Sequence, residues 1–191
     1  MGQYYKPAME INGEIKVFNR DVDGQYTLAK LTEHSWWLNT CVNAISGMMY
    51  KNPVRLVWCG DYANDESDEL KSPNSTAERV LTFDDIWNIP DEKNLGLIKT
   101  DFTLDNKFLV NHDTMEYMDC NKYKKLSTDS NNWVMHPVSL LTAIGNGRGG
   151  GDYYQSAINS DKIGLWCWDK ISIEDEAPIG YTETMIIFKE G

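Results

Sequence analysis

The sequence predicts a single α+β domain, residues 1–191, in which about two helices pack on an antiparallel or mixed sheet. Short apolar segments typical of strands recur along the chain, and turn-forming pairs such as Asn12-Gly13 and Asp23-Gly24 separate them. Only two segments carry apolar residues at helical spacing. The chain has 191 residues, 41% of them hydrophobic, and no linker or long repeat divides it. This composition fits one domain with a buried core and excludes a disordered chain.

A three-strand meander is expected at the start of the chain. Residues 4–11, 14–18 and 26–31 have strand-like patterns, and the Asn-Gly and Asp-Gly pairs between them favour tight hairpin turns. Strands are favoured again throughout residues 95–126 and near the end of the chain. The later strands are expected at residues 55–58, 97–103, 108–112, 115–120, 163–168 and 185–188.

Two helices are expected. Residues 35–50 carry apolar side chains at helical spacing, and Lys51 and Pro53 mark the end of that helix. The second helix is expected behind Ser75-Thr76-Ala77-Glu78, which has the S-x-x-E form of a capping box, and it should end before Pro90.

The charge of the chain is strongly negative and unevenly distributed. Eighteen Lys and Arg against 29 Asp and Glu give a net charge of −11, which argues against direct contact with nucleic-acid phosphates. Residues 61–92, the acidic segment, hold ten acids and two bases, a net charge of −8. This segment is either a solvated surface or a contact surface for a basic partner. The acids expected to contact such a partner are Asp65, Glu66, Asp68, Glu69, Asp84 and Asp85.

A glycine-rich loop, residues 145–151, holds five glycines in seven residues. The exposed N–H groups of such a loop can form an anion-binding nest. The stretch matches G-x-G-x-x-G, yet no helix is expected after it, so the context of a dinucleotide-binding fold is missing. It is therefore either a tight structural loop or a phosphate site, in which Asp152 would repel the phosphate unless a metal ion lay between them. The residues of the phosphate site would be Gly147, Arg148, Gly149, Gly150 and Asp152.

A short pattern that occurs twice in the sequence suggests a metal site. Cys59 and Asp61 have the same spacing as Cys167 and Asp169, and alternate residues of a strand share one face. Two such strands side by side would bring two thiols and two carboxylates together, and one of the three histidines would complete a zinc site. The alternative is that both cysteines are small core residues beside core tryptophans.

A second repeated pattern, Gly-Asp-Tyr, suggests a cluster of carboxylates. Gly-Asp-Tyr occurs at residues 60–62 and again at 151–153. If these loops converge, Asp61 and Asp152, together with Asp169, would form a cluster that binds a divalent cation or acts as acid and base. The alternative is that each of these aspartates caps a turn.

The cytoplasm is the expected location. No segment approaches the ~18 consecutive apolar residues of a membrane helix, and the first residues lack the pattern of a signal peptide. The four cysteines form no C-x-x-C pair, so core thiols or metal ligands are expected rather than disulfides.

Several stretches together resemble an uncharacterised family of phage and bacterial proteins. They are residues 1–7 (MGQYYKP), 33–35, 58–63 (WCGDYA), 136–137, 140–143 and 145–153 (GNGRGGGDY), together with Trp166 and Asp169. The sequence departs from the family pattern at Lys170, where the pattern has Arg, and at Cys167, where a small residue is usual. These departures weaken the two-thiol metal site. The zinc ligands that the resemblance then favours are Cys59, His34, His136 and His112.

The resemblance implies a phage or prophage gene product, and small acidic phage proteins of this kind include type II anti-CRISPR proteins. The first functional hypothesis is therefore a non-enzymatic inhibitor in the cytoplasm of an infected bacterium. Its acidic segment would bind a CRISPR effector nuclease and block DNA or guide RNA. The alternatives are a protein that binds a nucleotide or another phosphate ligand at the glycine-rich loop, and a metal-assisted hydrolase that uses Asp61, Asp152 and Asp169.

Overall fold

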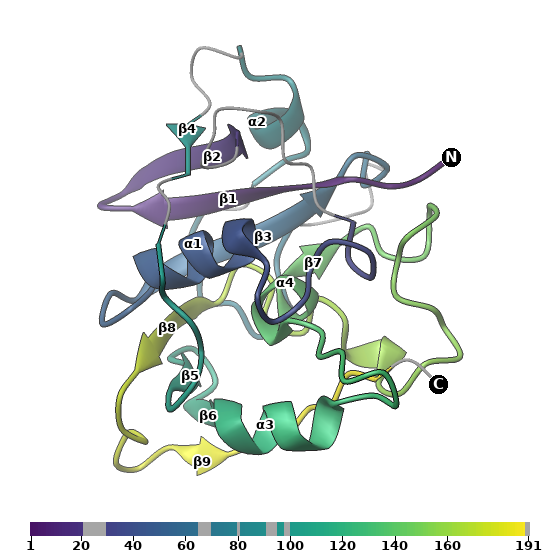
Figure 1. Ribbon diagram of the computed structural model, residues 1–191. Coiled ribbons are helices and arrows are strands. Elements are labelled where there is room, and N and C mark those ends of the chain that lie inside the picture. Colours follow the sequence, from purple (N-terminus) through teal and green to yellow (C-terminus); the bar gives the residue numbers. More distant parts are fainter. Residues whose placement is uncertain (21–29, 65–69, 80, 91–94, 98–99, 190–191) are drawn as a thin grey trace.

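The computed structural model describes residues 1–20, 30–64, 70–79, 81–90, 95–97 and 100–189. It shows a single α+β domain with a mixed sheet of nine strands and two helices of eight or nine residues (Figure 1). The fold class expected from the sequence is therefore confirmed.

The strands form one continuous sheet. They are β1 (Tyr5–Ile11), β2 (Glu14–Arg20), β3 (Val54–Gly60), β4 (Leu95–Gly96), β5 (Phe108–Asn111), β6 (Glu116–Asp119), β7 (Ala143–Ile144), β8 (Lys170–Glu174) and β9 (Thr182–Glu183). Their order is β4-β2-β1-β3-β8-β5-β6-β9, and β7 pairs with β3 beyond the end of β8. The pairs β2–β4, β3–β7 and β6–β9 are parallel, and the other pairs are antiparallel.

Four α-helices are described, and two of them are short. They are α1 (Thr40–Met48), α2 (Asp84–Trp87), α3 (Cys120–Ser127) and α4 (Pro137–Leu141), and a 3-10 turn spans Ser160–Lys162. Side-chain caps start the two longer helices: Asn39 accepts from two N–H groups of α1, and Asp119 does the same for α3. Within the described residues, no helix has the length and apolar character needed to cross a bilayer.

The sheet has a hydrophobic core on each face, and β3 shows why. Its side chains alternate, so Leu56 and Trp58 belong to one core while Val57 and Cys59 belong to the other. Residues of α1 and α4 complete the first core, and both helices lie against the same part of the sheet (Figure 1). Leu70, Leu81 and Ile86, from the acidic segment, cover the second core.

Several expected elements are confirmed, with shifted ends. β1, β2 and β3 lie where strands were expected, and β5 and β6 match the strands expected at residues 108–112 and 115–120 and form an antiparallel pair. The helix expected at residues 35–50 occurs but begins only at Thr40. Most of the third meander strand, residues 26–31, lies outside the described residues, and β1 instead pairs with β3 on its other side.

Other expectations are wrong. No helix begins at the capping box, because Ser75 Oγ donates to the carbonyl of Trp168 and accepts from the N–H of Ala77 instead. Residues 163–168 form turns, and the strand comes after them as β8. Residues 120–127 form α3 rather than a strand, because Asp119 caps a helix there. Residues 185–188 are not a strand, and the short β9 precedes them.

Candidate functional site

Three of the motif segments meet at one end of β1. The N–H of Gln3 donates to the carbonyl of Gly150 at 2.9 Å, and the N–H of Gly150 donates to the carbonyl of Met1 at 3.0 Å. The N–H of Asp61 donates to the carbonyl of Tyr4 at 2.8 Å, while the N–H of Tyr4 donates to Asp61 Oδ1 at 3.1 Å. The chain start, the WCGDYA stretch and the glycine-rich loop therefore form one structural unit.

The glycine-rich loop does form an anion-binding nest, and its anion is Asp152. Oδ2 of Asp152 accepts hydrogen bonds from the N–H groups of Gly147, Arg148 and Gly149 at 2.8, 2.9 and 2.9 Å. Its Oδ1 accepts from the Tyr5 hydroxyl at 2.8 Å, and the residue is only 4% exposed. The N–H groups that a phosphate would use are thus already engaged, so a phosphate could bind there only by displacing Asp152.

Close packing explains the glycines around Gln3. A Cβ atom at Gly149 would lie 2.4 Å from Cβ of Gln3, and one at Gly60 would lie 1.9 Å from its Nε2. A Cβ at Gly145 would lie 2.9 Å from the same Nε2. Gln3 is completely buried, and its amide has no hydrogen-bond partner among the described residues. The loop therefore needs glycine in order to pack against the chain start.

Asp61 lies near Asp152, as the sequence led us to expect. The pKa of Asp61 is raised, first by partial burial and then by the charge of Asp152. The pKa of Tyr5 is raised far above its ordinary value by burial and by the carboxylate of Asp152. Tyr5 is therefore a neutral hydrogen-bond donor between the two motif loops.

Asp169 does not join this pair. It is fully buried and accepts hydrogen bonds from Ser72 Oγ and from the amide of Asn111, the latter at 2.7 Å. Burial raises its pKa, and the charges that act on it come from Asp113 and Arg55. The expected three-carboxylate cluster is therefore wrong in this respect: Asp61 and Asp152 lie in one network and Asp169 in another.

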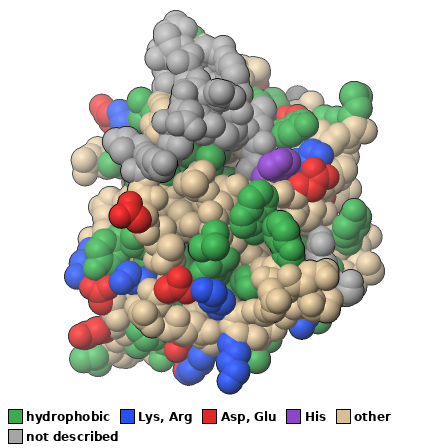
Figure 2. Space-filling view, viewed as in Figure 1, with side chains coloured by type: hydrophobic (Ala, Val, Ile, Leu, Met, Phe, Trp, Pro, Cys, Tyr) green, Lys and Arg blue, Asp and Glu red, His purple; other side chains and the backbone are tan. Residues whose placement is uncertain are grey.

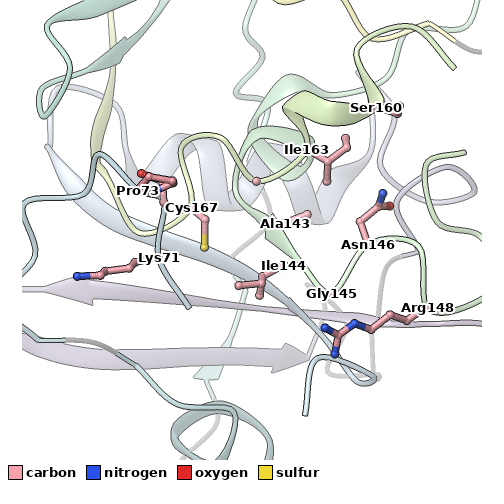
Figure 3. Close-up of a pocket in the computed structure, with 12 residues that line it drawn as sticks. Lys71, Pro73, Ala143, Ile144, Gly145, Asn146, Arg148, Ser160, Ile163 and Cys167 are labelled. Carbon is pink, nitrogen blue, oxygen red and sulfur yellow. The ribbon is translucent and has the colours of Figure 1, made fainter. Parts of the chain in front are cut away.

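A cavity of about 310 Å³ lies beside the glycine-rich loop. Its described lining residues include two cations, Lys71 and Arg148, and no acid. Figure 3 shows the Lys71 ammonium at one end, directed away from the other side chains, and the Arg148 guanidinium at the other end, with Ile144 and Cys167 between them. One guanidinium nitrogen of Arg148 donates to the carbonyl of Tyr62 at 2.9 Å, which links the loop to the WCGDYA stretch. Apolar and polar side chains both line the cavity, and its two cations lie at opposite ends rather than together around one phosphate.

The middle of the acidic segment, at Thr76, is fixed to the sheet by Arg55 on β3. The Arg55 guanidinium donates to Asp113 Oδ2 at 2.8 Å, to the carbonyl of Trp168 at 3.0 Å and to Thr76 Oγ1 at 3.0 Å. Asp113 also accepts from the N–H and the hydroxyl of Thr76. Trp168 has a positive φ of 60°, unusual for a bulky residue, and this conformation directs its carbonyl to Arg55 and Ser75.

The rest of the described acidic segment is attached at three further points. The Trp168 indole donates to the carbonyl of Arg79 at 2.9 Å. The Lys6 ammonium on β1 donates to the carbonyl of Ile86 and lies 4.4 Å from the centre of the Trp87 ring. The Trp87 indole donates to the carbonyl of Cys59 at 3.2 Å. These contacts hold α2 firmly over the sheet.

The described acids of this segment differ in their solvent exposure and in their hydrogen-bond and ion-pair partners. Glu78 and Asp84 are exposed, although Asp84 accepts from the amide of its neighbour Asn88. Asp85 is half-buried, accepts hydrogen bonds from the N–H and the hydroxyl of Thr82, and lies 3.6 Å from the Arg79 guanidinium. The other expected partner contacts, Asp65, Glu66, Asp68 and Glu69, lie outside the described residues.

The four expected zinc ligands have different surroundings. Cys59 is buried in the second core, and His34 is exposed beside Trp36. His112 lies between the hydroxyls of Tyr181 and Ser172. His136 is fully buried near Trp37. In the part of the chain that the structure describes, no group of three or more His, Cys, Asp or Glu side chains is placed to hold a metal ion.

The cysteines behave as core residues. All four are buried thiols outside any disulfide, and Cys59 and Cys167 lie in the same core, close enough for Cys59 to raise the pKa of the Cys167 thiol beyond the effect of burial. The two cysteines of the repeated Cys-x-Asp pattern therefore lie close together, whereas the aspartates of that pattern, Asp61 and Asp169, lie in separate networks.

Comparison of the chain with family models, with curated proteins and with solved structures finds no match. The family resemblance therefore stays a prediction.

Two features of the structure were missed by sequence reasoning. The first is the Arg55–Asp113 pair, whose partners are 58 residues apart and share no motif. The second is a pair of exposed apolar side chains, Leu38 and Trp133, beside the half-buried Trp36, in two loops that pair through a bridge between Trp36 and Met135. The only available signal was the unusual tryptophan content, 7 residues, which does not say which of them are exposed.

Proposed function

We propose that the protein is a non-enzymatic inhibitor of a host defence system, which binds a type II CRISPR effector nuclease through its acidic segment. The observation that supports this most is the attachment of the acidic segment to the sheet by Arg55 and Lys6. A surface that is held in place before binding loses less conformational entropy when a partner binds. Glu78 and Asp84 are presented to solvent on this fixed base.

The charge of the segment suits the proposed partner. RNA-guided nucleases hold their nucleic acids in a positively charged channel. A segment whose sequence carries a net charge of −8 over residues 61–92 is complementary in charge to such a channel and would compete with DNA or guide RNA for it. Such complementarity mainly speeds association, so binding should weaken as the salt concentration rises.

The arrangement of the three aspartates does not support the metal-assisted hydrolase hypothesis. Asp152 is bound by three N–H groups and the Tyr5 hydroxyl, and Asp169 lies in a separate buried network. For this reason we do not propose metal-assisted hydrolysis.

The test is binding of the purified protein to purified type II effector nucleases, with and without guide RNA. Tight binding in one of the two states, and loss of DNA cleavage, are expected. A Glu78→Lys/Asp84→Lys variant should associate at least about tenfold more slowly, because reversing charges in a complementary surface reduces the association rate. A second variant that reverses the acids at 65, 66, 68 and 69 should have a larger effect.

A matched control distinguishes the effect of this local surface on binding from the effect of the overall net charge. Asp101 and Glu176 are exposed acids outside the acidic segment, and an Asp101→Lys/Glu176→Lys variant changes the net charge by the same amount. This control should bind almost as fast as the unchanged protein. No binding in either state would contradict the proposed function, and equal loss in both variants would contradict the assignment of the surface.

A second candidate function is binding of a small anionic ligand in the cavity beside the glycine-rich loop. It is favoured by Arg148, which stands at one end of a cavity without a described acid in its lining. Calorimetry with pyrophosphate and with nucleotides tests it. Arg148→Gln should abolish binding, while reversal of Glu78 and Asp84 should leave it unchanged, which is the opposite of the result expected for the inhibitor.

A further inference from the structure

The sequence contains two Asn-Gly pairs, Asn12-Gly13 and Asn146-Gly147, and the fold places them in very different surroundings. The first pair forms the turn between β1 and β2, at the left edge of the molecule in Figure 1. The second pair lies in the glycine-rich loop. An asparagine that precedes a glycine is prone to lose its side-chain amide, because glycine has no Cβ atom to shield its backbone nitrogen. The two pairs therefore share one chemistry in two environments.

This chemistry is an attack of a backbone nitrogen on the side chain of the preceding residue. The glycine nitrogen loses its proton and forms a bond to Cγ of the asparagine, while the bond from Cγ to Nδ2 breaks and Nδ2 leaves as ammonia. Water then opens the resulting cyclic imide at either of its two carbonyls, which gives aspartate or isoaspartate. The net change is the exchange of an –NH2 group for an –OH group, and water is the only co-reactant.

The Asn12-Gly13 pair is open to this attack. Both residues are exposed, and nothing lies within 4 Å of the place that a Cβ atom at Gly13 would occupy. Their positive φ angles, 54° and 78°, fit a tight hairpin turn, and the pairing of β1 with β2 ends before them, at Ile11 and Glu14. A turn beyond the last paired residues opens at a low cost in free energy. Rotation of the Asn12 side chain toward the Gly13 nitrogen therefore disturbs only the turn.

The Asn146-Gly147 pair is closed to the same attack. The amide nitrogen of Asn146 donates to the carbonyl of Tyr153 at 3.1 Å, and the amide oxygen accepts from the N–H of Tyr153 at 2.8 Å. The N–H of Gly147 donates to Asp152 Oδ2 at 2.8 Å. Loss of that proton would leave a negative nitrogen beside a carboxylate, which is electrostatically unfavourable. The attacking atom and the attacked side chain are therefore both engaged until the loop opens.

We propose that Asn12 is a site of spontaneous deamidation in the folded protein, and that the fold protects Asn146 from the same reaction. The inference does not depend on the proposed inhibitor function.

The product alters the β1–β2 hairpin. A carboxylate at position 12 joins Glu10 and Glu14 at this end of the hairpin, where Lys16 is already paired with Glu14. Figure 2 shows charged side chains of both signs along the same left edge of the molecule. An isoaspartate also routes the backbone through a side-chain carbon, which lengthens the turn and weakens the pairing of Ile11 with Glu14. The deamidated protein should therefore melt at a lower temperature than the fresh protein.

The test is tandem mass spectrometry of the full chain after incubation at neutral and at mildly alkaline pH. Trypsin should release residues 1–16 as one peptide, because Pro7 blocks cleavage after Lys6, and Asn12 is the one asparagine in it. Asn146 lies in a separate peptide, residues 126–148. We expect Asn12 to react at least about tenfold faster than Asn146, since even a modest free energy of loop opening reduces the reactive population tenfold. The rate should rise with pH, because the attacking nitrogen must lose a proton.

Two controls separate the fold from the local sequence. In urea both pairs should react at similar rates, because nothing then holds the Asn146 side chain or the Gly147 nitrogen. An Asn12→Asp variant supplies the aspartate form of the 1–16 peptide as a reference, and it should fold because Asp-Gly also suits this turn. If Asn12 stays intact in the folded protein, or if Asn146 reacts as fast as Asn12 there, the proposal is overturned. Asn146 that stays intact in urea would equally overturn the claim that the fold protects it.

Discussion

The Tyr5 hydroxyl donates a hydrogen bond of 2.8 Å to Oδ1 of Asp152, which lies 147 residues later in the chain. The other oxygen of the same carboxylate accepts three N–H groups from the glycine-rich loop. One buried side chain therefore closes the loop and also attaches it to the first strand. The stretches GNGRGGGDY and MGQYYKP are two halves of one structural unit, and their residues are explained by packing and hydrogen bonding without any bound ligand.

Replacement of Asp152 by Asn should destabilise the protein by about 3 kcal/mol, because the amide nitrogen cannot accept hydrogen bonds and charge-assisted bonds are the stronger kind. Urea unfolding measures the free energy of unfolding of the variant. Tyr5→Phe removes a single hydrogen bond of the same carboxylate and should cost only about 1 kcal/mol. An Asp152→Asn variant as stable as Tyr5→Phe would show that the nest contributes little.

Alanine at Gly149 should lower stability strongly or prevent folding. Its Cβ atom would lie 2.4 Å from Cβ of Gln3 and 2.8 Å from the backbone nitrogen of Gln3, so one of the two segments has to move. Overpacking of this kind typically costs about 1–3 kcal/mol. Gly96→Ala is the control, since nothing lies within 4 Å of a Cβ there. Thermal unfolding of the two variants should differ clearly, and equal melting temperatures would contradict the close packing around Gln3.

Arg55→Lys should loosen the acidic segment. A guanidinium reaches Asp113, the Trp168 carbonyl and Thr76 at the same time, whereas an ammonium is a single point charge and cannot reproduce this fork. We expect faster cleavage within residues 61–92 by a protease specific for glutamate, for which the substitution adds no site. Arg79→Lys is the matched control, because the Arg79 side chain is exposed and its ion pair with Asp85 is long, at 3.6 Å. Equal cleavage rates in the two variants would contradict the role of Arg55.

The fold class could be predicted because it depends on local patterns. The short apolar run of β3 and the Asn12-Gly13 turn between β1 and β2 specify these strands without help from distant residues. The elements that were wrong depend on distant partners. Ser75 has the sequence of a helix cap, yet its hydroxyl bonds to Trp168, 93 residues later. Trp168 in turn ends the apolar run of residues 163–168 with a left-handed conformation that no pattern announces.

The sequence predicted which residues form the candidate site, but not which group the anion-binding nest holds. The sequence indicated an anion nest in the glycine-rich loop and a nearby Asp61, and both are present. What periodicity could not show is that the anion is Asp152 of the same loop. A carboxylate three to five residues beyond the donors competes with a free phosphate because it is always nearby, at a high effective concentration.

His136 should make the stability of the protein depend on pH. Burial lowers its pKa to about 3, compared with 6.5 for an ordinary histidine, and neither ring nitrogen has a partner among the described residues. Below pH 6.5 the unfolded chain binds a proton at this site, while the native protein does not until the pH approaches 3. The stability due to the neutral ring is therefore complete above pH 6.5 and decreases as the pH falls. Between about pH 6.5 and pH 5 this amounts to about 2 kcal/mol.

Urea unfolding at a series of pH values, for the unchanged protein and for His136→Phe, measures this contribution. Phenylalanine keeps an aromatic ring beside Trp37 and carries no proton, so the variant should lose about 2 kcal/mol less than the unchanged protein over the same pH interval. His112, whose pKa is also lowered by partial burial, is present in both proteins and cancels in the difference. An unchanged pH dependence in the variant would mean that His136 reaches solvent, or becomes protonated, in the native state.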